Sequence, residues 1–267
     1  MPLWAGICPS GCSEQGDTMQ YMQALVASFA VATSTIAASA ADIPLYTKSI
    51  PAPAKVEYGN LYFGVDWTSH KSLAGYTGVL YAPHGMHQSG WRLSAFGLVG
   101  RYEYHGGDNG ELFKGKFVSS DALIGWSHVF GNGAFTLQVG ANYQDHRVKP
   151  NDPNNPVVGS KLGFKAQADL WFNPNEQTLI YGLASYSTAF NTYYAVGRVG
   201  YDFFKTEVFF GPEIGALGND RTDQQRVGVH FTGIKVGPGK VTISGGWMHE
   251  RGEGNGGYAA GSIDFSF

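Results

Sequence analysis

The most restrictive feature of this chain is the alternating polarity of its last ten residues. One set of alternate positions is apolar or glycine and comprises Ala259, Gly261, Ile263, Phe265 and Phe267. The other set is polar and comprises Ser262, Asp264 and Ser266. Because successive side chains of a strand point to opposite faces, this strand has one apolar face and one hydrated face. Such a strand fits a closed barrel in lipid, or alternatively the last strand of a soluble sandwich.

Composition favours the barrel. Only 15% of the 267 residues are charged, whereas 14% are aromatic and 38 are glycine; soluble domains carry about 25% charged residues. No apolar run reaches the roughly 18 residues that a membrane-spanning helix needs. Low charge without long apolar runs is typical of strands that alternate between lipid and lumen. The net charge of -3 gives no reason to expect a nucleic-acid partner.

About twelve strand-like segments follow Tyr58. They begin near Asn60, Leu73, Trp91, Phe117, Ala134, Lys161, Gln177, Thr192, Thr206, Gln225, Lys240 and Gly257. We therefore predict an all-β fold, an antiparallel up-and-down transmembrane β-barrel of about twelve strands over residues 58–267. Ten or fourteen strands are the alternatives, because strand boundaries are the least certain part of such a prediction.

The connectors between these segments alternate in predicted length. Tight turns are expected at Gly131–Gly133, Asn173–Asn175, Phe204–Lys205 and Gly237–Gly239. Longer polar loops are expected at His105–Lys116, Asp145–Ser160, Gly218–Gln224 and Glu250–Gly256, with a short exception around Asn191. This alternation is typical of outer-membrane barrels of Gram-negative bacteria, in which both termini lie in the periplasm.

Residues 1–40 resemble an export signal. A moderately apolar stretch, Ala24–Ile36, precedes Ala38–Ala40, which has the small-x-small form of a signal-peptidase site. However, no Lys or Arg precedes Lys48, whereas signal peptides begin with positive charge. A misassigned start, with Met19 or Met22 as the true start, would explain part of this defect. The alternative is a structured N-terminal arm.

Residues 41–57 are expected to form a periplasmic leader, because Pro44, Pro51 and Pro53 do not suit a strand interior. Both cysteines, Cys8 and Cys12, precede the predicted cleavage site. The exported chain would therefore contain neither a disulfide nor a cysteine nucleophile.

Charged and amide side chains on the polar face of the strands are expected to point into the lumen. The candidates are Lys165, Gln167, Asp169, Arg198, Asp202, Glu213 and Asp264. The opposite orientation is costly, since an Arg or Lys facing the bilayer midplane loses about 2–4 kcal/mol. Two interpretations remain open for these charges. They line a narrow water path, or they pair across the lumen, as the two cations could with Asp169 and Asp202, and fill it.

The order of several motifs resembles a known family, the alphaproteobacterial cellulose biosynthesis protein BcsS. The first motifs are Gly75-Tyr76, Leu80–Pro83, Gly90–Leu93 and Gly100–Tyr104. Further motifs are Asp152–Asn155, Gly163–Lys165, Leu170-Trp171, Gly211–Glu213 and Arg226–His230. The resemblance implies an exported protein associated with exopolysaccharide production. Its implied partners are cellulose and other cellulose-synthesis components, besides outer-membrane lipid.

We expect glycan contacts on the loops, because sugars stack on aromatic faces and bond to amides. The candidates are Tyr104, Asn109, Asn151 and Asn154. The function that the sequence favours is a non-enzymatic outer-membrane barrel serving cellulose biosynthesis, export or surface anchoring. The alternative is a small-solute porin or a structural surface barrel.

Enzyme chemistry receives little support. Ser127-His128 is an adjacent nucleophile and base, but neighbours on a strand point to opposite faces, which prevents the required hydrogen bond. A membrane-embedded lipid hydrolase is therefore a minor alternative. The sequence predicts no catalytic residue, no metal site and no cofactor.

Overall fold

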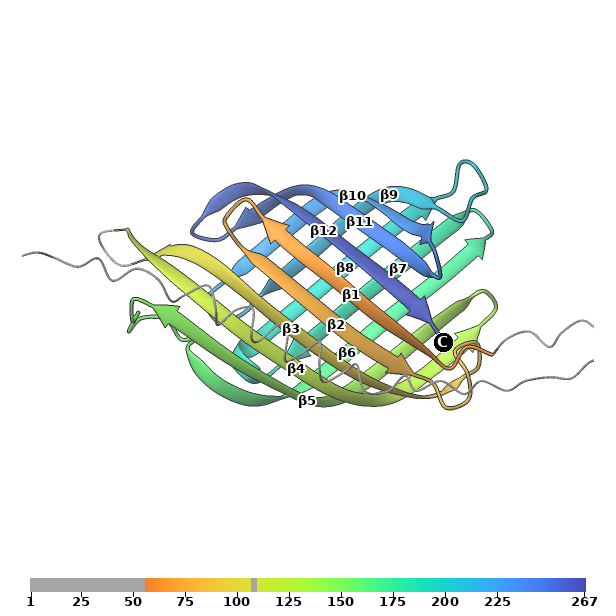
Figure 1. Ribbon diagram of the computed structural model, residues 1–267, viewed down its shortest axis with the longest axis horizontal. Helices are drawn as coiled ribbons and strands as arrows, with labels where there is room; N and C mark the ends of the chain where they lie inside the picture. The colour runs from red at the N-terminus through yellow and green to blue at the C-terminus, as the bar shows by residue number, and fades with distance from the viewer. Residues whose placement is uncertain (1–55, 107–109) are drawn as a thin grey trace, which may run out of the picture. The chain divides into compact units, whose positions relative to one another are not determined.

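The computed structural model describes residues 56–106 and 110–267, which form a closed antiparallel barrel of twelve strands (Figure 1). The strands are β1 (Gly59–Thr68), β2 (Leu73–Tyr81), β3 (Gly90–Gly106), β4 (Glu111–Phe130), β5 (Gly133–Lys149), β6 (Gly159–Asn175), β7 (Thr178–Ser187), β8 (Thr192–Tyr201), β9 (Phe209–Gly218), β10 (Asp223–Val236), β11 (Gly239–Glu250) and β12 (Gly254–Ser266). A short 3₁₀ helix, η2 (Ala189–Asn191), joins β7 to β8. Within these described ranges, no helix is long and apolar enough to cross a membrane.

The predicted strand number and up-and-down order are confirmed, since each strand pairs with its neighbours in sequence and β1 pairs with β12. Closure leaves no strand edge unpaired, which is what a sheet in lipid requires. The predicted presequence, 1–40, and nearly all of the predicted leader, 41–57, lie outside the described residues.

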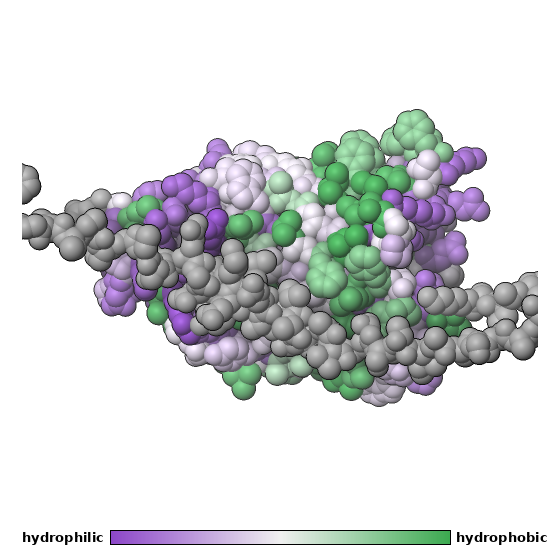
Figure 2. All heavy atoms as spheres, viewed as in Figure 1, coloured by the Kyte–Doolittle hydropathy of each residue, from purple (hydrophilic) through white to green (hydrophobic). Residues whose placement is uncertain are grey.

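Strand register fixes which side chains face the lumen. Across the closing pair of strands, Tyr62 lies opposite Asp264 and Asp66 lies opposite Ala260, so these residues share the inner face. On the outer face Phe63 lies opposite Ile263. The alternation predicted for the last strand is therefore confirmed. Figure 2 shows hydrophobic residues gathered on the barrel wall between hydrophilic ends.

The barrel has two ends, which we name by their connectors. The terminus end carries Gly59, Phe267 and the connectors 82–89, 131–132, 176–177, 202–208 and 237–238. The loop end carries the connectors 69–72, 107–110, 150–158, 188–191, 219–222 and 251–253. The tight turns predicted at Gly131–Gly133 and Gly237–Gly239 are confirmed, but the predicted alternation in length is wrong, because the terminus-end connectors 82–89 and 202–208 are long and most loop-end connectors are short. The short connector around Asn191 is confirmed.

The sequence motifs expected to be long loops are largely strand. β3 continues to Gly106 and β5 continues to Lys149, so most of His105–Lys116 and the first part of Asp145–Ser160 are paired. The physical reason is an inward-facing aromatic cluster at the loop end. Its members are Tyr102, Tyr104, Phe113, Phe117, His146 and Phe190. Packing of these rings stabilises strands that extend beyond the apolar wall.

Gly140 on β5 provides a test of how closely the strands pack. A Cβ atom at this position would overlap the backbone oxygen of Ala122 on β4. We expect Gly140→Ala to lower the free energy of unfolding by about 1–3 kcal/mol, as overpacking does. The control is Gly182→Ala on β7, where the nearest atom to the added carbon is the Val196 oxygen at 4.0 Å. Urea unfolding in micelles measures both, and equal stability of the two variants would contradict this packing.

Candidate functional site in the barrel lumen

An ion pair between β1 and β10 crosses the lumen. The Arg226 guanidinium donates two hydrogen bonds to the Asp66 carboxylate, at 2.6 and 2.8 Å. Its Nε donates to the Gln224 side chain at 2.6 Å. Since β11 and β12 lie between β10 and β1 in the sheet, this contact joins strands that are not neighbours. A bidentate Arg–carboxylate pair has a fixed geometry and is among the stronger charge-assisted contacts.

The same guanidinium is connected to a second ion pair through the side chain of Tyr258. Arg226 lies over the ring of Tyr258, 4.8 Å from its centroid. The Tyr258 hydroxyl donates to Glu213 at 2.8 Å, and Arg198 Nε donates to the other oxygen of Glu213 at 2.5 Å. Arg198 in turn lies 5.5 Å from the ring centroid of Tyr181. We call these contacts, from Asp66 to Tyr181, the central network.

A second group of contacts links β4, β5, β6 and β7 on the inner face. Lys165 pairs with Asp121, and the Asn142 amide also donates to Asp121. Ser187 donates to the Asn142 oxygen at 2.7 Å. The Gln144 amide donates to Thr192 of β8 at 3.0 Å. Because these polar groups are mostly buried, they satisfy one another in place of water.

Most predicted lumen residues lie on the inner face, but their pairing differs from expectation. Lys165 pairs with Asp121 and Arg198 pairs with Glu213, rather than with Asp169 and Asp202. Gln167 and Asp169 also face inward on β6, since they lie opposite Gln138 and Thr136. Asp264 faces inward on β12 and accepts a 3.5 Å hydrogen bond from Asn60.

Asp202 does not belong to the lumen wall; its predicted position there is wrong. It lies in the β8–β9 connector, where its carboxylate accepts the backbone N–H of Phe204 at 3.1 Å and of Glu207 at 2.6 Å. Burial raises the pKa of this carboxyl, but the backbone donors outweigh burial and hold the pKa below its ordinary value. Asp202 therefore shapes a turn.

Sequence reasoning missed the partners in these networks. Asp121, Asp66 and Tyr258 were not among the candidates, and Arg226 was noticed only as part of a motif. The signal was present for Arg226, because Arg226 and His230 alternate with Val227 and Val229 along one strand. Which carboxylate meets which cation depends on strand tilt and register, which the sequence pattern does not fix.

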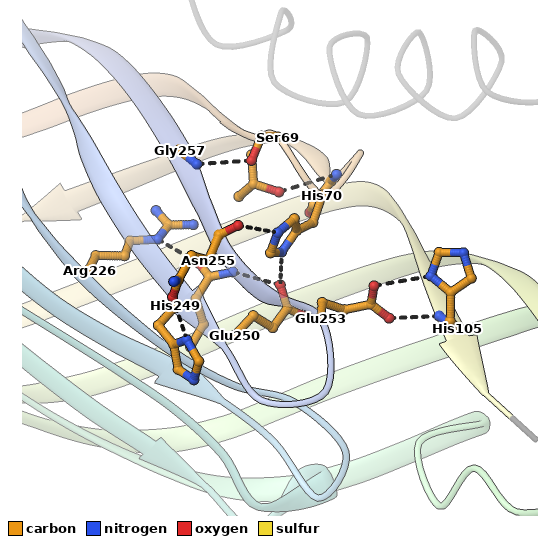
Figure 3. Close-up of polar contacts among 12 residues, drawn as sticks. Ser69, His70, His105, Arg226, His249, Glu250, Glu253, Asn255 and Gly257 are labelled. Carbon is orange, nitrogen blue, oxygen red and sulfur yellow. Dashed lines mark hydrogen bonds and ion pairs between the residues drawn. The ribbon is translucent and has the colours of Figure 1, made fainter. Parts of the chain in front are cut away.

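The loop end is tied by contacts among its connectors (Figure 3). Glu250 contacts both His70, at 3.4 Å, and the Gln224 amide, at 3.1 Å. In the next connector Glu253 accepts the backbone N–H of His105 at 2.7 Å and contacts its ring at 3.1 Å. The β11–β12 connector thereby reaches β3, although β1 and β2 lie between β12 and β3 in the sheet.

A second contact crosses the loop end from the β9–β10 connector. Arg221 lies 4.6 Å from the ring centroid of Tyr104 on β3. The Tyr104 hydroxyl donates to Asp152 at 2.8 Å and accepts from Asn155 at 2.7 Å. The β9–β10 connector thus reaches β3, although β9 and β3 lie six strands apart in the ring of twelve, and the β5–β6 connector contacts the same Tyr104.

The predicted loop contacts for sugars have different environments. Tyr104 is buried, with 7% of its surface exposed, and stacks on Phe113 at 5.2 Å; it serves the loop-end packing instead of presenting a free ring. Asn151 and Asn154 are exposed in the β5–β6 connector. Asn109 lies outside the described residues.

The Ser127-His128 pair is split by the barrel wall, as predicted. Ser127 is buried and accepts a 3.1 Å hydrogen bond from Thr136, whereas His128 is exposed and lies against Phe130 on the outer face. Among residues 56–106 and 110–267, no group of three or more His, Cys, Asp or Glu side chains is placed to hold a metal ion.

Comparison with known protein families shows which family the chain belongs to. Residues 60–267 match the family model described as cellulose biosynthesis protein BcsS. The chain belongs to the BcsS family. The match covers the whole of the barrel except its first residue, so the lumen and both ends described above are features of a BcsS protein.

Other comparisons add little to this relationship. A comparison with curated proteins finds no match. Among solved structures, the chain is similar to the KdgM porin, with 10% identity, a TM-score of 0.41, and coverage of 78% of this chain and 99% of that one. It is also similar to OprB of Pseudomonas putida, with 9% identity, a TM-score of 0.32, and coverage of 79% and 92% respectively.

Removal of Arg226 tests the central network. Asp66 would lose its bidentate partner, so we expect Arg226→Met to lower the free energy of unfolding by about 3 kcal/mol, the low end for a broken buried pair because Asp66 is partly exposed. The double variant Arg226→Met/Asp66→Leu should recover much of this loss. Urea unfolding measures both values. The control Lys235→Met removes an exposed pair with Glu207, and a loss there as large as that of Arg226→Met would contradict a special role for the network.

Proposed function

We propose that this BcsS protein is a non-enzymatic outer-membrane barrel that serves cellulose biosynthesis by export of the polymer or by its attachment at the cell surface. The observation that carries the proposal is the family match over the entire barrel. Its architecture supports the membrane location, because an apolar outer face surrounds a polar lumen in a sheet without edges.

The same proposal gives the barrel an orientation. In barrels of this kind both termini lie in the periplasm, so we assign the terminus end to the periplasm and the loop end to the cell surface. Asn151 and Asn154 would then be presented outside the cell, where their exposed amides are our candidates for contact with the polymer. Reaching this location requires export, which the signal-like residues 1–40 would supply.

Cellulose output in living cells tests the function. We expect a strain that lacks this gene to make less cellulose or to retain it in the envelope, and the intact gene to restore the wild-type state. Glucan-specific dye binding and enzymatic digestion of the product measure amount and location. Unchanged amount, location and attachment of cellulose in the deletion strain would contradict the proposal.

The alternative function, a small-solute porin, makes a different prediction about the lumen. The crossing contacts at the loop end and the buried ion pairs favour a barrel with low ion conductance. We expect small single-channel currents for the wild type in planar bilayers, and larger currents for Arg221→Ala/Glu253→Ala, in which both mouth contacts are lost. Lys235→Ala, near the opposite end, is the control. Large, stable wild-type currents would favour the porin instead.

A further inference from the structure

Two inward-facing aromatic side chains are accessible to solvent. Trp171 on β6 lies opposite Tyr181, and Tyr194 on β8 lies opposite Ser185, in registers that place all four on the inner face. Trp171 and Tyr194 each expose 41% of their surface, whereas inward-facing Glu213 exposes 4%. An inward side chain is surrounded by the barrel wall, so solvent must reach these two rings through the lumen or through its mouth at the terminus end.

More aromatic rings line the opposite wall. Tyr62 on β1, Tyr76 on β2 and Phe96 on β3 all face inward, and their ring centroids lie 6.0 to 6.5 Å apart. We call these three residues the β1–β3 wall. Their spacing is that of rings in direct contact, so they form one continuous aromatic surface.

The two aromatic surfaces face each other. In the ring of twelve strands β7 and β8 lie six strands away from β1 and β2, respectively, so Tyr181 and Tyr194 project from the wall opposite Tyr62 and Tyr76. Trp171 extends its side of the lumen, since it meets Tyr181 edge to face at 5.8 Å. Space beside Trp171 and Tyr194 is therefore bounded by rings on both sides.

Polar groups without ionic partners lie on the inner face of β5 and β6, on the same strand as Trp171 or beside it. Asp169 forms no ion pair and Gln167 forms no side-chain hydrogen bond with any residue in the described part of the chain. Gln138, opposite Gln167, uses its amide nitrogen to bond Ser94 at 3.1 Å, which leaves its oxygen as an acceptor. Amide and carboxylate groups beside aromatic faces form the donor and acceptor set that binds hydroxyl-rich ligands.

These features define the ligand's chemistry. In a β-linked glucose unit every hydroxyl is equatorial, so both faces of the ring carry C–H groups that stack on aromatic rings, and the hydroxyls project from the edge. Arg198 is neutralised by Glu213 and Arg226 by Asp66, so neither guanidinium is free to bind an acidic sugar, and the site favours a neutral one. We propose that the lumen between Trp171, Tyr194 and the β1–β3 wall binds a neutral β-1,4-linked glucan chain.

The positions of the two exposed rings indicate a chain ligand and a direction of entry. Trp171 lies near the terminus end of β6, and Tyr194 lies near the loop end of β8. An extended oligosaccharide reaches both rings, whereas one sugar ring does not. The Arg221–Tyr104 contact crosses the loop end from the β9–β10 connector to β3, so the chain enters from the terminus end. This inference rests on the proposed function, which supplies a glucan to the periplasm.

Calorimetric titration of the full chain folded in micelles tests the site. We expect cellohexaose to bind and maltohexaose, whose α-linkages coil the chain, to bind at least about tenfold more weakly. Trp171→Ala should weaken cellohexaose binding about tenfold or more, and Tyr194→Ala should act in the same direction. The control is Trp247→Ala, which removes an outward-facing ring that is 48% exposed and should leave binding unchanged.

Three results would overturn the site. They are the absence of cellohexaose binding by folded wild-type protein, equal binding of the two hexaoses, and equal effects of Trp171→Ala and Trp247→Ala. Such a failure is distinct from failure of the proposed function, which the deletion strain tests without reference to the lumen. Normal cellulose output in a Trp171→Ala strain, together with unaltered cellohexaose binding, would likewise remove Trp171 from the site.

Discussion

The need to pair every backbone N–H and C=O group in lipid governs this structure. A sheet meets that need only when its first and last strands pair, and the β1–β12 register achieves this closure. Closure in turn assigns each side chain to lipid or lumen, because the side-chain period of a strand is two. The lumen networks are consequences of this assignment, since a charged group that cannot face lipid must find its partner inside.

The interior divides into regions with different character. Buried ion pairs such as Arg226–Asp66 and Arg198–Glu213 join strands across part of the lumen and hold its walls together. Aromatic rings fill the loop end, where connectors meet over the mouth. Trp171 and Tyr194 also face inward, and each keeps 41% of its surface exposed. Paired charges and solvent-accessible rings therefore occur together on the inner face of one barrel.

Sequence periodicity predicted the architecture well, because the alternation of apolar and polar residues within each strand indicates which of its faces meets lipid. It predicted that Asp264 faces inward and that twelve strands close the barrel. It did not predict how far β3, β4 and β5 extend at the loop end, since Phe113 and His146 lie in polar stretches that were expected to be loops. The aromatic packing that keeps these stretches in strand form involves residues far apart in sequence, such as His146 and Phe190.

In the candidate site, too, the sequence pattern predicted which side chains face inward but not which residues they contact. Polarity alone placed Lys165 and Arg198 inside, but their partners depend on tilt and register. Asp202 failed as a lumen residue because its polarity reflects a turn, in which a carboxylate satisfies backbone N–H groups. Tyr104 failed as an exposed ring because Asp152 and Asn155 hold its hydroxyl beneath a connector.

The division between lipid and lumen is the central claim, and accessibility of single labelled positions on β5 tests it most directly. In a chain with Cys8 and Cys12 replaced by serine, a fluorophore would be attached to a cysteine at Leu137, Gln138 or Val139 in turn, and a quencher placed in the lipid acyl chains. The account predicts strong quenching at Leu137 and Val139 and weak quenching at Gln138, which is 3% exposed and faces inward. Equal quenching at all three positions would contradict it.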